Sequence, residues 1–212
     1  MKKLLIIALA AAPLLASASP ALGPNLVTNG GFEIVKAATA TQAATSQKNH
    51  SYSVYSSIYG WKASHGIELR NDFVGTGHKS PTFAELDVNV NSAISQVITT
   101  DIGQWYQLSF DYANRAGATN GLGWSFGETA GAAIIAAPKL DKAGWTTFTT
   151  QVRATSNHMT LSLAALGKSD GVGSSLDNVQ LNAVPEPTSL ALMGLGLAAM
   201  GLVSRRKKQK RG

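Results

Sequence analysis

Cysteine is absent from this 212-residue chain, which excludes disulfide bonds and thiolate metal sites. Charged residues are also scarce, at 14%. The formal net charge of +6 comes from the two ends, because residues 22–184 hold ten Lys and Arg against eleven Asp and Glu. That region has no basic cluster that could neutralise phosphates, so nucleic acid is excluded as a partner.

Spacings typical of catalytic or metal centres are also lacking. The histidines show neither an H-E-x-x-H motif nor an i, i+4 pair; they are His50, His65, His78 and His158. Gly123–Gly127 matches the G-x-S-x-G nucleophile pattern through Ser125, and Asp141 and His158 follow in the required order. The segment after Gly127 is a poor helix, so we interpret the match as a strand and assign no catalytic residue. An esterase or a polysaccharide hydrolase using an unidentified carboxylate pair remains a minor alternative.

The N-terminus has the three regions of a secretory signal peptide. Lys2 and Lys3 precede an apolar run that ends in small residues, including Ala16 and Ala18. We expect residues 1–21 to be the signal segment and signal peptidase to cut after Ala18, with Ala21 as the alternative. The run is short for a spanning helix, which needs roughly 20 apolar residues.

The C-terminus has three parts in a fixed order. Pro185-Glu186-Pro187 interrupts regular structure, residues 189–203 are apolar, and residues 205–211 begin with Arg205-Arg206 and are basic. We expect the apolar run to span the inner membrane, with the basic end in the cytoplasm and the preceding domain outside. An ordinary tail anchor would share these features.

This tail, residues 185–212, resembles the PEP-CTERM sorting signal through Pro185, Glu186, Pro187, Arg205 and Arg206. The resemblance implies cleavage by an exosortase in a Gram-negative bacterium that makes exopolysaccharide. It also implies a membrane-anchored precursor and a mature form at the cell surface or outside the cell.

Residues 22–184 contain many short alternating segments separated by turn residues, which predicts an all-β fold, an antiparallel jelly-roll β-sandwich. Expected strands include 59–62, 66–70, 82–87, 92–99, 105–112, 121–126, 132–137, 145–152, 158–163 and 175–181. Residues 36–57 lack periodicity and are predicted to form a long loop.

The ordered segments also resemble the galactose-binding-like jelly-roll family of carbohydrate-binding modules. The matching pieces are NLVTNGGFE at 25–33, Gly60-Trp61, FAELD at 83–87, residues 94–100 with 103–112, 145–152 and GSSLDNVQL at 173–181. The resemblance implies that the two ends of the domain pair and hold one structural Ca²⁺ through Glu33 and Asp177, with carbonyls of Asn29 or Gly31. Asp177 could instead cap a turn, and Glu85 with Asp87 is expected on an exposed face or in a strand-end network.

Exposed aromatic and polar side chains are the candidates for saccharide binding: Trp61, Tyr59, Arg70, Asp72 and Arg115. The alternative for the aromatics is the core, and for the arginines strand-end ion pairs. We expect a non-catalytic, exopolysaccharide-binding surface or matrix protein that contributes to biofilm. A self-associating structural protein that binds no glycan is the alternative.

Overall fold

The computed structural model describes residues 21–36, 41–42, 51–71, 82–114, 120–130 and 145–185, together with Gly196. Contacts within the chain define one compact unit, Leu22–Pro185, and a second unit formed by the two ends. The predicted signal segment with Ala16 and Ala18, and the tail from Glu186 through Arg205 and Arg206, lie outside the described residues apart from Gly196. Within the described residues there is no helix with the length and apolar character needed to cross a membrane.

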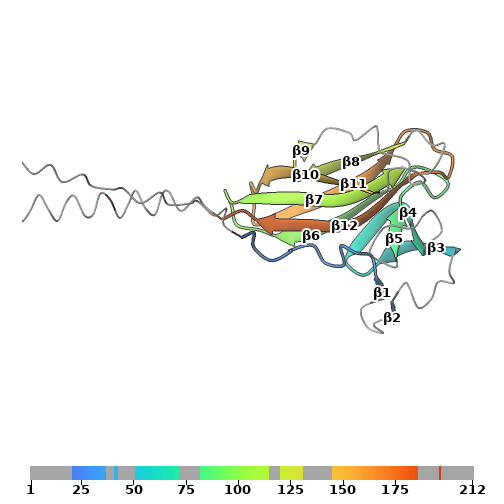
Figure 1. Cartoon of the computed structure of the whole chain (residues 1–212), viewed down its shortest axis with the longest axis horizontal. Coiled ribbons are helices and arrows are strands. Elements are labelled where there is room, and N and C mark those ends of the chain that lie inside the picture. Colours follow the sequence, from blue (N-terminus) through green and yellow to red (C-terminus); the bar gives the residue numbers. More distant parts are fainter. Residues whose placement is uncertain are drawn as a thin grey trace, which may run out of the picture. The chain divides into compact units, whose positions relative to one another are not determined.

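The compact unit is built from strands, which confirms the predicted all-β class (Figure 1). The strands are β1 (Ile34–Lys36), β2 (Thr41–Gln42), β3 (Ser51–Ile58), β4 (Trp61–Asn71), β5 (Phe83–Glu85), β6 (Ala93–Thr99), β7 (Trp105–Asn114), β8 (Gly121–Phe126), β9 (Thr129–Ala130), β10 (Thr146–Arg153), β11 (His158–Leu166) and β12 (Ser174–Ala183).

The strands form two layers that share β4. One layer has the order β10-β7-β12-β5-β4 and the other continues as β4-β6-β11-β8-β9. The first half of β4 pairs with β6 through Lys62 and Ser95, whereas its second half pairs with β5 through Glu68 and Glu85. All pairings are antiparallel, and successive strands from β10 to β12 alternate between the layers. These features confirm the antiparallel jelly-roll sandwich.

The core lies between the layers because alternate side chains of each strand point inward. In β6 the buried apolar residues are Ile94 and Ile98, and the residues between them are polar or exposed. The largest fully buried side chains come from both layers: Phe32, Phe110, Phe126, Ile67, Leu69, Leu86, Ile94, Leu108, Leu122, Leu161, Leu163 and Leu176.

The predicted long loop at residues 36–57 is wrong at three places: Lys36 ends β1, Thr41–Gln42 is β2, and the residues from Ser51 onward form β3. This strand pairs along β4 from Ser51 to Ile58. Tyr52 and Val54 alternate with Ser51 and Ser53 but remain 53% and 48% exposed, so this alternation does not mark a side of the strand that faces the core. Residues 61–62 of the strand predicted at 59–62 and the whole strand predicted at 66–70 belong to the single strand β4, while Tyr59 and Gly60 form the turn before it. The strand predicted at 132–137 lies outside the described residues.

The N-terminal segment connects the two layers. The Gly23 and Leu26 amides donate to carbonyls of β12, at Ala183 and Leu181. Farther along, the Gln96 side chain on β6 accepts from the Thr28 amide at 2.9 Å and donates to the Thr28 carbonyl at 3.2 Å. This segment therefore closes the sandwich along the edge between β12 and β6.

Candidate functional site

A surface groove of about 620 Å³ lies beside the turn between β3 and β4. Its walls come from three places in the chain: the N-terminal segment, the β3–β4 turn and β6. The lining residues are Thr28, Ser57, Ile58, Tyr59, Gly60, Trp61, Lys62, Ser95, Gln96 and Val97. Lys62 is the one charged side chain among them, so the groove carries little charge and combines polar with apolar side chains.

The β3–β4 turn holds Tyr59 at the groove by its backbone. The Tyr59 amide donates to the Val35 carbonyl at 2.9 Å, and its carbonyl accepts from the Asn29 side chain at 2.9 Å. Gly60 follows with φ of 82°, and a Cβ atom there would lie 2.8 Å from the Thr28 carbonyl oxygen. A glycine is therefore required at this position. The Tyr59 side chain is 41% exposed, which leaves its ring available to a ligand.

Trp61 has the opposite environment from Tyr59, and this corrects its expected role. Its side chain is 2% exposed and packs on Phe32 with ring centroids 5.7 Å apart. Its indole Nε1–H donates to the Asn29 carbonyl at 3.1 Å. Trp61 therefore supports the floor of the groove from the core and does not offer its ring face to a ligand.

Arg70 is also buried, at 3% exposure, and belongs to an ion cluster instead of a ligand surface. Glu68 and Glu85 occupy directly opposite positions on β4 and β5, where like charges repel. The Arg70 guanidinium pairs with Glu68 at 2.5 Å and with Glu85 at 3.0 Å. It also lies 5.2 Å from the centre of the Tyr52 ring. Arg70 therefore forms ion pairs, as the alternative predicted, and does not form part of a ligand surface. Asp72 and Arg115 lie outside the described residues.

The first and last motifs of the domain do lie together. The Val179 amide of β12 donates to the Gly30 carbonyl at 3.0 Å, at the point where the β12 register shifts. Asp177 is fully buried, and a Cβ atom built on Gly31 would lie 3.9 Å from both Asp177 Oδ1 and Glu33 Cγ. The two carboxyl side chains predicted to hold calcium therefore flank Gly31.

Asn29 has another role than the one expected. Its Oδ1 accepts from the Ile34 amide at 3.1 Å, and its backbone carbonyl accepts from Trp61 and from the Phe32 amide, each at 3.1 Å. With both oxygens engaged, Asn29 fastens the turn and is a poor calcium ligand. The described residues contain no group of three or more His, Asp or Glu side chains suited to a metal ion.

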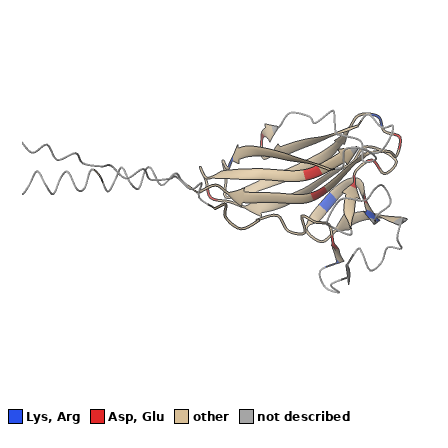
Figure 2. Cartoon of the chain, viewed as in Figure 1, with Lys and Arg blue, Asp and Glu red and all other residues tan. Residues whose placement is uncertain are grey.

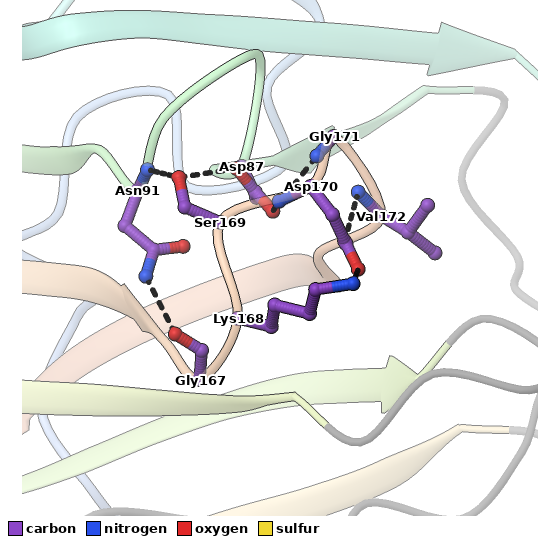
Figure 3. A network of polar contacts seen from close by, with 8 residues as sticks. All are labelled: Asp87, Asn91, Gly167, Lys168, Ser169, Asp170, Gly171 and Val172. Carbon is purple, nitrogen blue, oxygen red and sulfur yellow. Dashed lines mark hydrogen bonds and ion pairs between the residues drawn. The ribbon is translucent and has the colours of Figure 1, made fainter.

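The second acidic pair is divided between two buried networks. Glu85 joins the Arg70 cluster and also accepts from the Gly173 amide at 2.8 Å. Asp87 is 1% exposed, and its Oδ2 accepts from the Asp170 and Gly171 amides at 2.9 and 3.0 Å (Figure 3). The carboxylates therefore fix the loop before β12. Few other charged side chains occur along the strands (Figure 2).

Sequence reasoning missed several groove residues: Ser57, Lys62, Ser95, Gln96 and Val97. One signal was present, because Gln96 occupies a core-facing position between Ile94 and Ile98, where an amide needs a partner. The serines and Lys62 carry no such signal. They share the groove only because β3, β4 and β6 are neighbours.

Ser125, the residue of the G-x-S-x-G match, lies inside β8, directly opposite Ser162 of β11 and Ala130 of β9. A nucleophile elbow needs a sharp turn between a strand and a helix. The match is therefore part of a regular strand, as we interpreted it.

The fold and the C-terminal sorting motif define an exported β-sandwich protein. The PEP-CTERM protein-sorting motif matches residues 183–207. It marks an exported protein that is sorted via the membrane, and it implies processing by an exosortase. Residues 25–182 match the family described as "Protein of unknown function (DUF642)", and the chain belongs to this family.

Among curated proteins, the chain is similar to the multifunctional-autoprocessing repeats-in-toxin of Vibrio vulnificus, with 29% identity over 182 residues. The match covers 77% of this chain and 3% of the toxin, so the chain spans a small part of that relative's length.

Two solved carbohydrate-binding modules are also similar. A family 35 module from Clostridium thermocellum has 15% identity and a TM-score of 0.46, covering 62% of this chain and 97% of the module. The CBM22-1 xylan-binding domain from Paenibacillus barcinonensis has 13% identity and a TM-score of 0.42, covering 66% and 96%.

Proposed function

We propose that this protein is a non-catalytic, polysaccharide-binding component of the bacterial surface or extracellular matrix. The single observation that carries the proposal is the groove beside Tyr59, which combines an exposed aromatic ring with hydroxyl groups and one cation. Aromatic rings pack on the apolar faces of sugar rings, while a few placed polar groups fix the orientation of a ligand.

A row of polar side chains extends from this groove across the neighbouring strands. Ser57 lies opposite Lys62, which lies opposite Ser95 of β6. The row continues through Ser162 of β11 to Ser125 of β8. Neighbouring strands are about 4.8 Å apart, so the row offers hydrogen-bonding groups at regular intervals. This arrangement suits an extended glycan chain better than a single sugar.

The test is glycan-array or exopolysaccharide binding by the mature protein and its Tyr59→Ala variant. We expect loss of the ring to weaken binding about tenfold, equivalent to roughly 1.4 kcal/mol of stacking. Tyr52→Ala is the matched control, because Tyr52 is 53% exposed and does not line the groove. Absence of binding to any polysaccharide, or equal weakening by the two variants, would reject the groove as the glycan site.

A self-associating surface protein is the second candidate. The outer face of β6 and β11 carries small side chains such as Ser95 and Ser162, with Val97 69% exposed on the same face. Such a face of small side chains with one exposed valine can pack against a second copy. Sizing of the mature protein with and without polysaccharide separates the two functions, because self-association needs no glycan.

We also propose that Glu33 and Asp177 hold one structural Ca²⁺. Calcium takes six to eight oxygen ligands, so the Gly31 carbonyl, other backbone carbonyls and water would complete the shell. Its contribution would be to fasten the N-terminal turn to β12. These two carboxyl groups fit a hard cation, although they supply only part of its shell.

Calcium removal is expected to lower the melting temperature of the wild-type protein, as followed by circular dichroism with and without chelator. Glu33→Ala should abolish this sensitivity, because one of the two carboxylates is lost. Glu128→Ala, a change in the exposed turn between β8 and β9, should retain it. A melting temperature unaffected by chelation in the wild type would exclude the ion.

We also propose that the precursor is cleaved at both ends. We expect signal peptidase to remove the N-terminal segment, the apolar run to anchor the precursor with its basic end in the cytoplasm, and an exosortase to cut near Pro185–Pro187. The order of box, apolar run and basic end supports this route.

A further inference from the structure

Three exposed hydrophobic side chains gather at the end of the sandwich where the chain leaves β12. They are Leu22, Ile102 and Trp105, with exposures of 41%, 66% and 48%. We refer to these three residues as the terminal patch. These three residues neither line the groove nor belong to the buried core.

Backbone hydrogen bonds bring the terminal patch together around the chain exit. The Val184 amide donates to the Trp105 carbonyl at 2.8 Å, and the Gly23 amide, next to Leu22, donates to the Ala183 carbonyl at 2.9 Å. Ile102 lies in the turn before β7, where the Gly103 amide donates to the Ala154 carbonyl at 2.8 Å. The three residues therefore lie near the point from which the tail continues.

The length of the connection limits how far this end can be from a membrane. Only three residues lie between Pro185 and Ser189, where the apolar run begins, and the four steps along the chain span at most roughly 14 Å. The polar headgroup layer on each side of a bilayer takes about 5–8 Å of that distance. In an anchored precursor, the end of the domain must therefore lie close to the lipid surface.

The chemistry of the terminal patch suits the interface between lipid and water. Tryptophan is enriched at this interface, where its ring sits at the headgroup level. Arg153 lies directly opposite Trp105 on β10 and is anchored by its Nε–H to the Gly103 carbonyl at 2.9 Å. Asp101 is exposed in the same turn, so the local charges offset each other. Apolar contact should therefore dominate over attraction to anionic lipids.

We propose that the terminal patch docks on the periplasmic leaflet of the inner membrane in the anchored precursor and orients the Pro185–Pro187 segment at the lipid surface. This inference rests on the anchored precursor of the proposed function. It does not depend on glycan binding.

The absence of cysteine allows a site-specific test. Full-length precursors carrying Ile102→Cys or Val54→Cys are spin-labelled and reconstituted into phosphatidylcholine vesicles. Collision of each label with oxygen, which concentrates in lipid, is then compared with collision with a water-soluble nickel complex. We expect the label at 102 to favour oxygen and the label at 54 to favour nickel.

Val54 is a suitable control because it is 48% exposed but far from the terminal patch. Its neighbours across successive strands are Glu68, Glu85, Ser175 and finally Ala113. Ala113 lies eight residues along β7 from Trp105, or about 26 Å.

Vesicle flotation distinguishes the possible failures. If the precursor floats with the vesicles but the label at 102 favours nickel as strongly as the label at 54, the docking inference is overturned alone. If the precursor does not float, both the anchoring and the docking are overturned. In a folded Ile102→Ser, Trp105→Ser precursor, a label at Leu22→Cys should lose its preference for oxygen, and retention of that preference would also contradict docking.

Discussion

At the scale of single residues, the structure separates side chains that look alike in the sequence. Tyr59 and Trp61 are aromatic residues on either side of Gly60, yet one is 41% exposed and the other 2%. The difference arises because Tyr59 lies in the turn while Trp61 begins β4 on the core side. Composition could propose both residues as ligand contacts, but only the strand register decides between them.

The Arg70 cluster leads to a prediction about stability. Arg70→Met would leave Glu68 and Glu85 facing each other, buried and without the guanidinium between them. Removing one partner of a buried ion cluster typically costs about 3–5 kcal/mol, and we expect a loss of this size in urea denaturation.

The control for Arg70→Met is Lys168→Met. Lys168 is 79% exposed and lies 3.4 Å from Asp170, so its removal should cost less than about 1 kcal/mol. Similar losses for the two variants would show that the buried cluster contributes no more than a surface ion pair.

At the scale of elements, the strands with clear alternation were predictable. The expected strand at 121–126 coincides with β8, and those at 105–112 and 158–163 lie within β7 and β11. β3 was missed although residues 51–54 alternate between polar and apolar side chains. Its Tyr52 and Val54 side chains face solvent instead of the core, and the strand is held by pairing with β4. The groove could not be predicted either, since its walls meet through contacts between residues far apart in the sequence, such as the hydrogen bond between Thr28 and Gln96.

The Gln96 contact predicts how the N-terminal segment is held. Gln96→Ala would remove both hydrogen bonds to Thr28, and we expect it to destabilise the domain by about 1–3 kcal/mol. Hydrogen exchange should accelerate at Thr28. Gln151→Ala, at an exposed position of β10, should change neither quantity, and unchanged exchange at Thr28 in the Gln96 variant would show that the segment is held by other contacts.

At the scale of the whole molecule, the two ends of the chain predict where it is cleaved during export and sorting. Replacing Pro185, Glu186 and Pro187 by alanine should leave the tail attached, because the extended and protease-accessible backbone is lost. Intact mass of the exported wild type should correspond to a chain that begins after Ala18 and ends near the box. The variant should retain the mass of the tail, and identical masses for the two proteins would contradict cleavage at this site.

The closure of the sandwich by its first and last segments has a consequence for biogenesis. The Asn182 side-chain amide on β12 donates a hydrogen bond to the Gly23 carbonyl, 159 positions earlier in the sequence. Contacts of such high sequence separation form slowly. A nascent chain that stops short of β12 has the inner side chains of both layers but lacks the strand that joins β7 to β5. Stable folding must therefore wait until Ala183 has emerged, only two positions before the sorting box. The domain should travel through the export machinery as an open chain and mature only as its own membrane anchor arrives.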